Sequence, residues 1–314
     1  MNISVIITSY NQKHYLAEAV YSVLAQTRPC FEIILVDDAS SDGSPKLVAE
    51  YAARYPDQIR AFCHQENLGI PGNRNFALSR VRGEYVAVLD GDDRFLPSKN
   101  EREMEFIRQN PDCLAVYSNV RYIDKSGRVL RNRDHRPQPA GMILGDVFRG
   151  MFGMLRSMLI RYDMLQEIGF MDPDFWHYDG FDLMVRLSAR YPVHYILEPL
   201  AEVRLHTAGA SGWRSIRHEI DDLTGVYQKH QHLMETLSRR EAAKVERYWQ
   251  VRIGRMSATM HWRNGQRWQG IRRFCGALAR SPALMGKLTL GYILPKSFFL
   301  RLVTWYHLIR KRPL

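Results

Sequence analysis

The chain has 314 residues, 46% of them hydrophobic, which is enough to bury a core in one large domain or two smaller ones. Its four cysteines lie far apart and form no CxxC pair, which argues against a zinc site or redox motif and favours the reducing cytoplasm. No uncharged apolar stretch reaches ~18 residues, and the first residues lack a basic region and cleavage site, so we expect neither a transmembrane helix nor a signal peptide.

Apolar runs alternate with helical spacing through the first ninety residues. The runs at 3–10, 31–38, 59–66 and 83–90 predict strands, and the segments 13–26, 44–56 and 72–82 predict helices. This alternation predicts an α/β fold, with a mostly parallel, Rossmann-like sheet and helices on both faces. Further on, residues 112–130 predict two strands around a turn at "DKSG".

Polar clusters follow three of the predicted strands: "TSYN", "DDAS" and "DGDD". In open α/β sheets, ligands bind beyond the carboxyl ends of the strands, so these clusters are expected at one ligand-binding edge. The alternative for Asp37, Ser40 and Ser41 is that they cap the following turns and helices.

The cluster "DGDD" places Asp90, Asp92 and Asp93 directly after the apolar run "VAVL". Adjacent carboxylates repel one another, and a divalent cation would relieve that repulsion and in turn hold a diphosphate. No GxGxxG follows the first strand and no GxxxxGK[ST] is present, which argues against a dinucleotide site and a P-loop.

Three stretches resemble the family 2 glycosyltransferases, which have the GT-A fold: "SVIITSYNQKHYLAEAVYSVLAQT", "EIILVDDASSDGS" and "NLGIPGNRNFALSRVRGEYVAVLDGDD". The resemblance is continuous over residues 3–95 and becomes thinner to about residue 212. It implies a nucleotide-sugar glycosyltransferase domain over residues 1–214. Residues 215–314 then form a basic, amphipathic helical extension.

The resemblance also implies roles for single residues. Asp90-Gly91-Asp92 matches the family's "DxD", in which Asp92 would bind Mn²⁺ or Mg²⁺ and Asp90 would face the ribose or the sugar. Donor-binding positions of the family match Thr8, Tyr10 and Asp38 for the nucleoside and Asn67, Gly69 and Arg74 for the loop under the nucleotide. His206, in "VRLHTAGAS", matches a histidine that reaches the metal or the diphosphate.

Most members of this family transfer the sugar with inversion of the configuration at its anomeric carbon, which requires a carboxylate base at the acceptor hydroxyl. The matching motif here is "YDGFDLMVRLS", residues 178–188, where the usual base position falls on Gly180. The base is then Asp179, which we favour, or Asp182. This departure keeps a second hypothesis open: a catalytically degenerate nucleotide- or nucleic-acid-binding protein on the same scaffold.

The resemblance implies transfer from a nucleotide-diphosphate sugar, most simply a UDP-sugar, to a hydroxyl of a cell-surface glycan precursor, lipid-linked in our interpretation. Residues 145–175 would line the acceptor side.

The net charge of +11 is unevenly spread, because residues 239–314 hold 17 Lys and Arg against 2 Asp and Glu. Basic, aromatic, amphipathic segments are typical of a membrane interface. We therefore expect a protein that is cytoplasmic and peripheral on the anionic inner face of the membrane, with no nucleic-acid partner, since no nucleic-acid motif is visible. The alternative is a helical cap with solvated charges.

Overall fold

The computed structural model describes residues 1–151, 155–206 and 216–280. The chain divides into two compact units, Met1–Arg214 and Ser215–Leu314. The strands of the first unit are β1 (Ile3–Ser9), β2 (Glu32–Asp37), β3 (Ile59–Cys63), β4 (Tyr85–Asp90), β5 (Arg94–Phe95), β6 (Ala115–Ile123), β7 (Val129–Asn132), β8 (Met158–Arg161) and β9 (His194–Arg204). Its helices are α1 (Lys13–Leu24), α2 (Ser44–Arg54), α3 (Gly69–Leu78), α4 (Lys99–Gln109), α5 (Leu144–Phe148), η1 (Leu155–Ser157), α6 (Tyr162–Ile168) and α7 (Asp179–Ser188).

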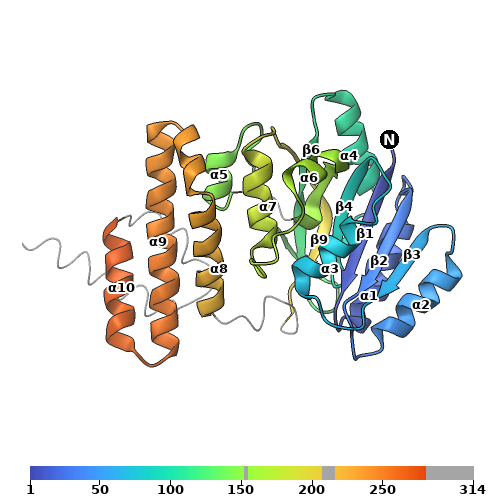
Figure 1. The fold of residues 1–314 in the computed structure, drawn as a ribbon, viewed down its shortest axis with the longest axis horizontal. Coiled ribbons are helices and arrows are strands. Elements are labelled where there is room, and N and C mark those ends of the chain that lie inside the picture. Colours follow the sequence, from blue (N-terminus) through green and yellow to red (C-terminus); the bar gives the residue numbers. More distant parts are fainter. Residues whose placement is uncertain (152–154, 207–215, 281–314) are drawn as a thin grey trace, which may run out of the picture. The chain divides into compact units, whose positions relative to one another are not determined.

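The strands of the first unit form one sheet in the order β3-β2-β1-β4-β8-β6-β9-β5, with β7 paired to β6. The strands β3, β2, β1 and β4 are parallel and lie side by side (Figure 1). Beyond β4 the directions mix, because β8 is antiparallel to both β4 and β6, whereas β9 is parallel to β6. The predicted α/β fold is confirmed, and its parallel half is the part in which helices alternate with strands.

The central strands are apolar because both of their faces are covered. Ile3, Val5 and Ile7 of β1 belong to one hydrophobic cluster with the apolar side chains of α1, α2 and α4. The intervening Ile6 is also fully buried, on the opposite face of the same strand. Near-continuous apolar runs are typical of parallel strands covered on both sides. Each fully buried aliphatic side chain of this kind contributes about 1.5–3 kcal/mol to stability.

Strand register brings the polar ends of three strands to one edge. Thr8 of β1 is the partner of Asp90 in β4 and of Val36 in β2. Beyond the strands, the amide of Asp38 donates to the carbonyl of Ser9 at 2.9 Å, and the amide of Gly91 donates to the carbonyl of Thr8 at 2.9 Å. The convergence predicted for "TSYN", "DDAS" and "DGDD" is therefore confirmed.

Two local predictions have different outcomes. The turn at "DKSG" connects β6 to β7 as expected, with Asp124 accepting hydrogen bonds from the amides of Ser126 and Arg128. The third helix, expected to begin at residue 72, begins at Gly69 instead. The reason is that a side chain satisfies a free amide of the first turn: Asn67 Oδ1 accepts from the amide of Gly69, at 3.1 Å.

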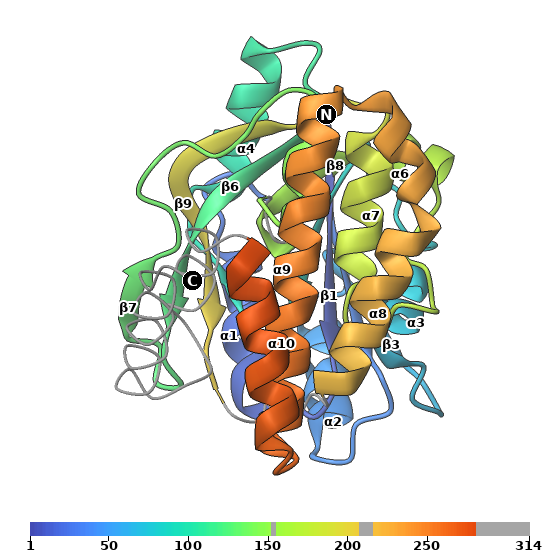
Figure 2. The ribbon, with the colours of Figure 1, turned by 90° about the vertical axis from the view of Figure 1, so that its left-hand side faces the viewer.

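The second unit contains α8 (Ile216–Lys229), η2 (Gln231–Thr236), α9 (Arg239–Arg263) and α10 (Arg267–Arg280). Within this unit α9 packs against both α8 and α10, and Figure 2 shows α9 lying along α10. Gly254 allows the close approach of these two helices, since a Cβ there would lie 2.9 Å from the Cβ of Ala277. Over the described residues, every helix is too short or too polar to cross a bilayer. The basic segments expected after residue 280 lie outside the described residues.

Candidate active site

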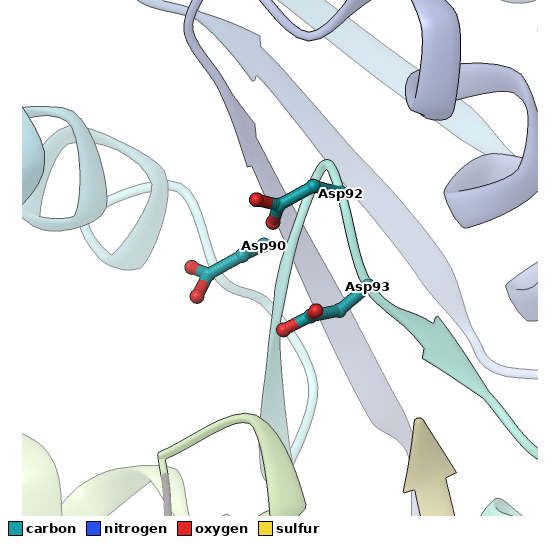
Figure 3. A group of neighbouring side chains, drawn as sticks. All are labelled: Asp90, Asp92 and Asp93. Atoms are coloured by element: carbon teal, nitrogen blue, oxygen red, sulfur yellow. The ribbon is translucent and has the colours of Figure 1, made fainter. Parts of the chain in front are cut away.

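The turn that follows β4 presents three carboxylates on the same side, as Figure 3 shows for Asp90, Asp92 and Asp93. Each offers one oxygen, and these oxygens all lie within 4.8 Å of one another. The turn is closed by the amide of Asp93, which donates to the carbonyl of Asp90 at 3.0 Å. A Cβ on Gly91 would lie 2.7 Å from Gln12 Oε1, so a larger residue here would displace the end of the Gln12 side chain.

Two arginines neutralise part of this acidic cluster. Asp90 pairs with Arg74, Oδ1 to Nη2 at 2.6 Å, and with Arg156, Oδ2 to Nη2 at 2.8 Å. Arg156 also pairs with Asp93, Nη1 to Oδ2 at 2.8 Å. Burial raises the pKa of Asp93 to about 7, against the influence of Arg156. From the sequence, a divalent cation was expected to relieve the repulsion between these carboxylates. Arg74 and Arg156, whose pairing the sequence analysis did not foresee, also supply two positive charges to the cluster.

The end of β9 fixes the other side of the turn. The Arg204 Nε donates to the carbonyl of Asp92 at 2.9 Å, and its amide donates to Asp93 Oδ1 at 2.8 Å. Two residues on, His206 Nε2 lies 2.9 Å from Asp92 Oδ2. The ring of Tyr15 contacts both, at 4.9 Å between ring centroids for His206 and 4.5 Å to the Arg204 guanidinium carbon. The structure thus places His206 beside Asp92.

Arg74 connects the acidic turn to α7. Its Nη1 lies 2.7 Å from Asp179 Oδ2, while its Nη2 binds Asp90. Asp179 is the first residue of α7, where the helix dipole favours a carboxylate. One guanidinium therefore joins the acidic turn after β4 to the first residue of α7.

The two candidate bases have different surroundings. Asp182 is fully buried and pairs with Arg186, Oδ2 to Nη2 at 2.7 Å. Arg186 in turn donates to the backbone carbonyls of residues 168–170. Asp182 thus helps to hold the segment after α6 through Arg186. Asp179 instead forms an ion pair with Arg74, which also binds Asp90.

The residues expected to hold the nucleoside lie around Asp38. Its carboxylate accepts from the amide of Leu68 at 2.8 Å, and its carbonyl accepts from Asn67 Nδ2 at 3.2 Å. Burial raises the pKa of Asp38. Thr8 is buried at the neighbouring strand end, and the side chain of Tyr10 is 51% exposed. The strand ends and the loop before α3 therefore form one connected wall.

Trp176 was not predicted as a site residue, although it packs on this wall. It lies three residues before Asp179, and its side chain is 52% exposed. Gly69 has φ +73°, and a Cβ there would lie 2.3 Å from the Trp176 Nε1. The indole also stacks on His177, with ring centroids 5.7 Å apart. A tryptophan two residues before the acidic motif was the available signal.

Arg156 was the second residue that the sequence analysis missed. It is the only charged side chain in "GMFGMLRSMLI", residues 150–160. A lone cation inside an apolar run requires an anionic partner wherever that run is buried, and this was the available signal.

The sequence profile of Glycosyl transferase family 2 matches residues 4–169, and the chain belongs to this family. It is 30% identical over 242 residues to the putative glycosyltransferase EpsE of Bacillus subtilis, covering 75% of this chain and 84% of EpsE. It is 35% identical over 136 residues to the putative teichuronic acid biosynthesis glycosyltransferase TuaG of the same organism, covering 43% and 53%. The uncharacterized protein Rv1520 of Mycobacterium tuberculosis is 38% identical over 126 residues, which span 40% of this chain but only 36% of that protein.

Solved structures share the fold at low sequence identity. Staphylococcus aureus TarS 1-349 in complex with UDP-GlcNAc is 16% identical, with a TM-score of 0.55 over 93% of this chain and 92% of that one. The mannosyltransferase PcManGT from Pyrobaculum calidifontis, in complex with GDP-Man and Mn²⁺, is also 16% identical, with a TM-score of 0.59 over 99% and 81%. These similarities confirm the GT-A fold.

The contact between Gly69 and Trp176 generates a prediction about stability. Gly69→Ala should destabilise the protein by about 1–3 kcal/mol more than Gly141→Ala, because overpacking adds to the backbone strain. Gly141 is the matched control, since its φ is +90° but no atom lies within 4 Å of its Cβ position. Urea unfolding measures both variants. Adding Trp176→Ala to Gly69→Ala should remove the excess, and equal effects of the two glycine variants would contradict the contact.

Proposed function

We propose that this chain transfers a glycosyl group from a nucleotide-diphosphate sugar, most simply a UDP-sugar, to a hydroxyl of a cell-surface glycan precursor, with inversion. Family membership supports glycosyl transfer, and the similarity to TuaG supports an acceptor in a polysaccharide of the cell envelope. The observation that carries the proposal is the joining of Asp90 and Asp179 by one guanidinium, because inverting transfer requires a donor site and a base side by side.

The donor is proposed to lie along the carboxyl edge of the parallel strands. Thr8, Tyr10 and Asp38 hold the nucleoside, with the exposed ring of Tyr10 beside the base. Asn67 orders the loop under the nucleotide through its hydrogen bond to Asp38. Arg74 and Asp90 then face the diphosphate and the ribose or sugar.

The residues present fit a hard divalent cation, Mn²⁺ or Mg²⁺. Ligands of such an ion lie about 2.0–2.1 Å from it, so carboxylate oxygens within 4.8 Å of one another need only small rotations to share one ion. Asp92 is the proposed direct ligand, with His206 at its side. When bound, the cation stabilises the charge of the leaving diphosphate.

Asp92→Asn should abolish the cation-dependent part of UDP binding and leave the fold intact. The reason is that Asp92 supplies a ligand charge but is not one of the two carboxylates paired with Arg156. Calorimetry of UDP with Mn²⁺ and with a chelator measures this dependence. The exposed pair of Arg161 and Asp163 provides Asp163→Asn as a control. Unchanged cation-dependent affinity in Asp92→Asn would contradict the metal assignment.

Asp179 is the proposed base, since Asp182 is fully buried and paired with Arg186. The Asp179 carboxylate, which Arg74 holds beside Asp90, would take the proton of the acceptor hydroxyl.

Asp179→Asn should reduce turnover by about 10²-fold or more and leave donor binding in place, as expected for a general base. Asp182→Asn should instead destabilise the fold by about 3–5 kcal/mol, because Arg186 loses a buried partner. UDP release from a UDP-sugar, calorimetry and urea unfolding distinguish these results. The base belongs to Asp182 if the two variants show the reverse pattern. Donor binding without any turnover in the wild type would favour the degenerate binding protein.

The second unit is proposed to dock on the anionic inner face of the cell membrane, beside a lipid-linked acceptor. On α10 the side chain of Trp268 is 83% exposed, and those of Arg272 and Arg273 are exposed as well. Each basic residue near an anionic leaflet contributes about 1 kcal/mol, and the indole adds an interfacial contact that salt does not screen.

The full chain should therefore sediment with anionic vesicles more than with neutral ones. The triple variant Trp268→Ala/Arg272→Glu/Arg273→Glu should sediment less. Lys46→Glu/Arg54→Glu is the control, because it changes the net charge equally on the exposed surface of α2. If the wild-type chain stays in the supernatant, the membrane proposal is wrong and a soluble acceptor is favoured.

A further inference from the structure

Arg156 occupies carboxylates that a divalent cation would need. Its two Nη atoms lie 2.8 Å from Asp90 Oδ2 and 2.8 Å from Asp93 Oδ2, and these residues are two of the three in the acidic cluster. A guanidinium and a metal ion are both cations, so they compete for the same carboxylate oxygens. Occupation of the cluster by one therefore weakens binding of the other.

We propose that Arg156 holds the acidic cluster in the ligand-free protein and turns onto the donor diphosphate when the divalent cation binds. This inference rests on the proposed function and adds a donor-binding residue to it. A guanidinium suits this exchange because its planar fork binds carboxylates and phosphates with the same bidentate geometry.

The contacts show why Arg156, rather than Arg74, is the arginine that moves. The side chain of Arg74 is 9% exposed, and its two Nη atoms bind carboxylates from β4 and α7. The side chain of Arg156 is 27% exposed, and its two carboxylate partners lie three residues apart, Asp90 at the end of β4 and Asp93 in the turn that follows. Moving Arg74 would separate two elements, whereas moving Arg156 changes contacts to one short segment only.

Both carboxylates that pair with Arg156 also have a second partner, which they would keep if Arg156 moved away. Asp90 keeps its ion pair with Arg74 at 2.6 Å. Asp93 keeps the hydrogen bond that its Oδ1 accepts from the amide of Arg204 at 2.8 Å. No carboxylate of the pair is then left without a donor, and the incoming cation takes the place of the positive charge that leaves. A purely structural arginine would be the sole partner of a buried acid, and here that condition is not met.

The test compares Mn²⁺ binding with nucleotide binding in the full-length protein. Free Mn²⁺ is counted by electron paramagnetic resonance during titration with Mn²⁺ alone, and UDP affinity is then measured at saturating Mn²⁺. Arg156→Gln should bind Mn²⁺ alone more tightly by at least about fivefold, the lower end of typical coupling between two ligands of one protein. The same variant should bind UDP more weakly. Arg161→Gln, which removes an arginine from the last position of β8, should change neither affinity.

Arg156→Lys guards against loss of the fold, since it keeps a cation beside the buried Asp93. Its ammonium lacks the planar fork with which Arg156 binds the two carboxylates, so the Mn²⁺ affinity of this variant should lie between those of the wild type and Arg156→Gln. Equal or weaker Mn²⁺ binding in these variants, with wild-type binding of Mn²⁺ and UDP intact, would overturn the role of Arg156 alone. A wild-type chain that binds neither Mn²⁺ nor UDP would overturn the proposed function as well.

Discussion

The arrangement of the site depends on the two ion pairs made by the buried guanidinium of Arg74. Arg74 lies 105 residues from Asp179 in the sequence and binds that carboxylate and Asp90 at the same time. Loss of one partner from a buried ion pair costs about 3–5 kcal/mol, so each of the three side chains holds the other two in place. The carboxyl edge of the sheet and the first turn of α7 are thereby set at a fixed separation before any substrate arrives.

The acidic turn is held from a second direction by β9. Arg204 contacts the backbone of Asp92 and the carboxylate of Asp93, and the ring of Tyr15 lies against both Arg204 and His206. Polar groups fixed in this way need little rearrangement when a charged ligand binds, which is how enzymes make electrostatic stabilisation effective. Arg204 thus helps to hold the acidic turn in one conformation, as an enzyme that binds a charged substrate there would require.

The sequence predicted the features that local patterns determine. Strand alternation and the carboxyl-edge rule placed Thr8, Asp38 and Asp90 together, and the register of three parallel strands explains why this succeeded. Resemblance to the family placed His206 near Asp92, which no local pattern would have done.

Ion pairs between residues that lie far apart in the chain could not be predicted from the sequence. Asp179 and Asp182 lie three residues apart on one helix, so their spacing alone does not say which one is buried against Arg186 and which one meets Arg74. Arg156 escaped notice because its partners lie more than sixty residues earlier in the chain. Ion pairs between distant segments leave no periodic signal, and only the folded chain shows them.

The packing of Trp176 on Gly69 has an evolutionary consequence. These positions lie in different motifs, one at the first residue of α3 and the other before α7, yet they share one small volume. A lineage that replaced the glycine would first need a smaller residue at position 176, and a lineage that kept the indole could not lose the glycine. Among relatives with this backbone conformation, the two positions should therefore vary as a pair, and an alignment of them would show correlated substitution between the two motifs.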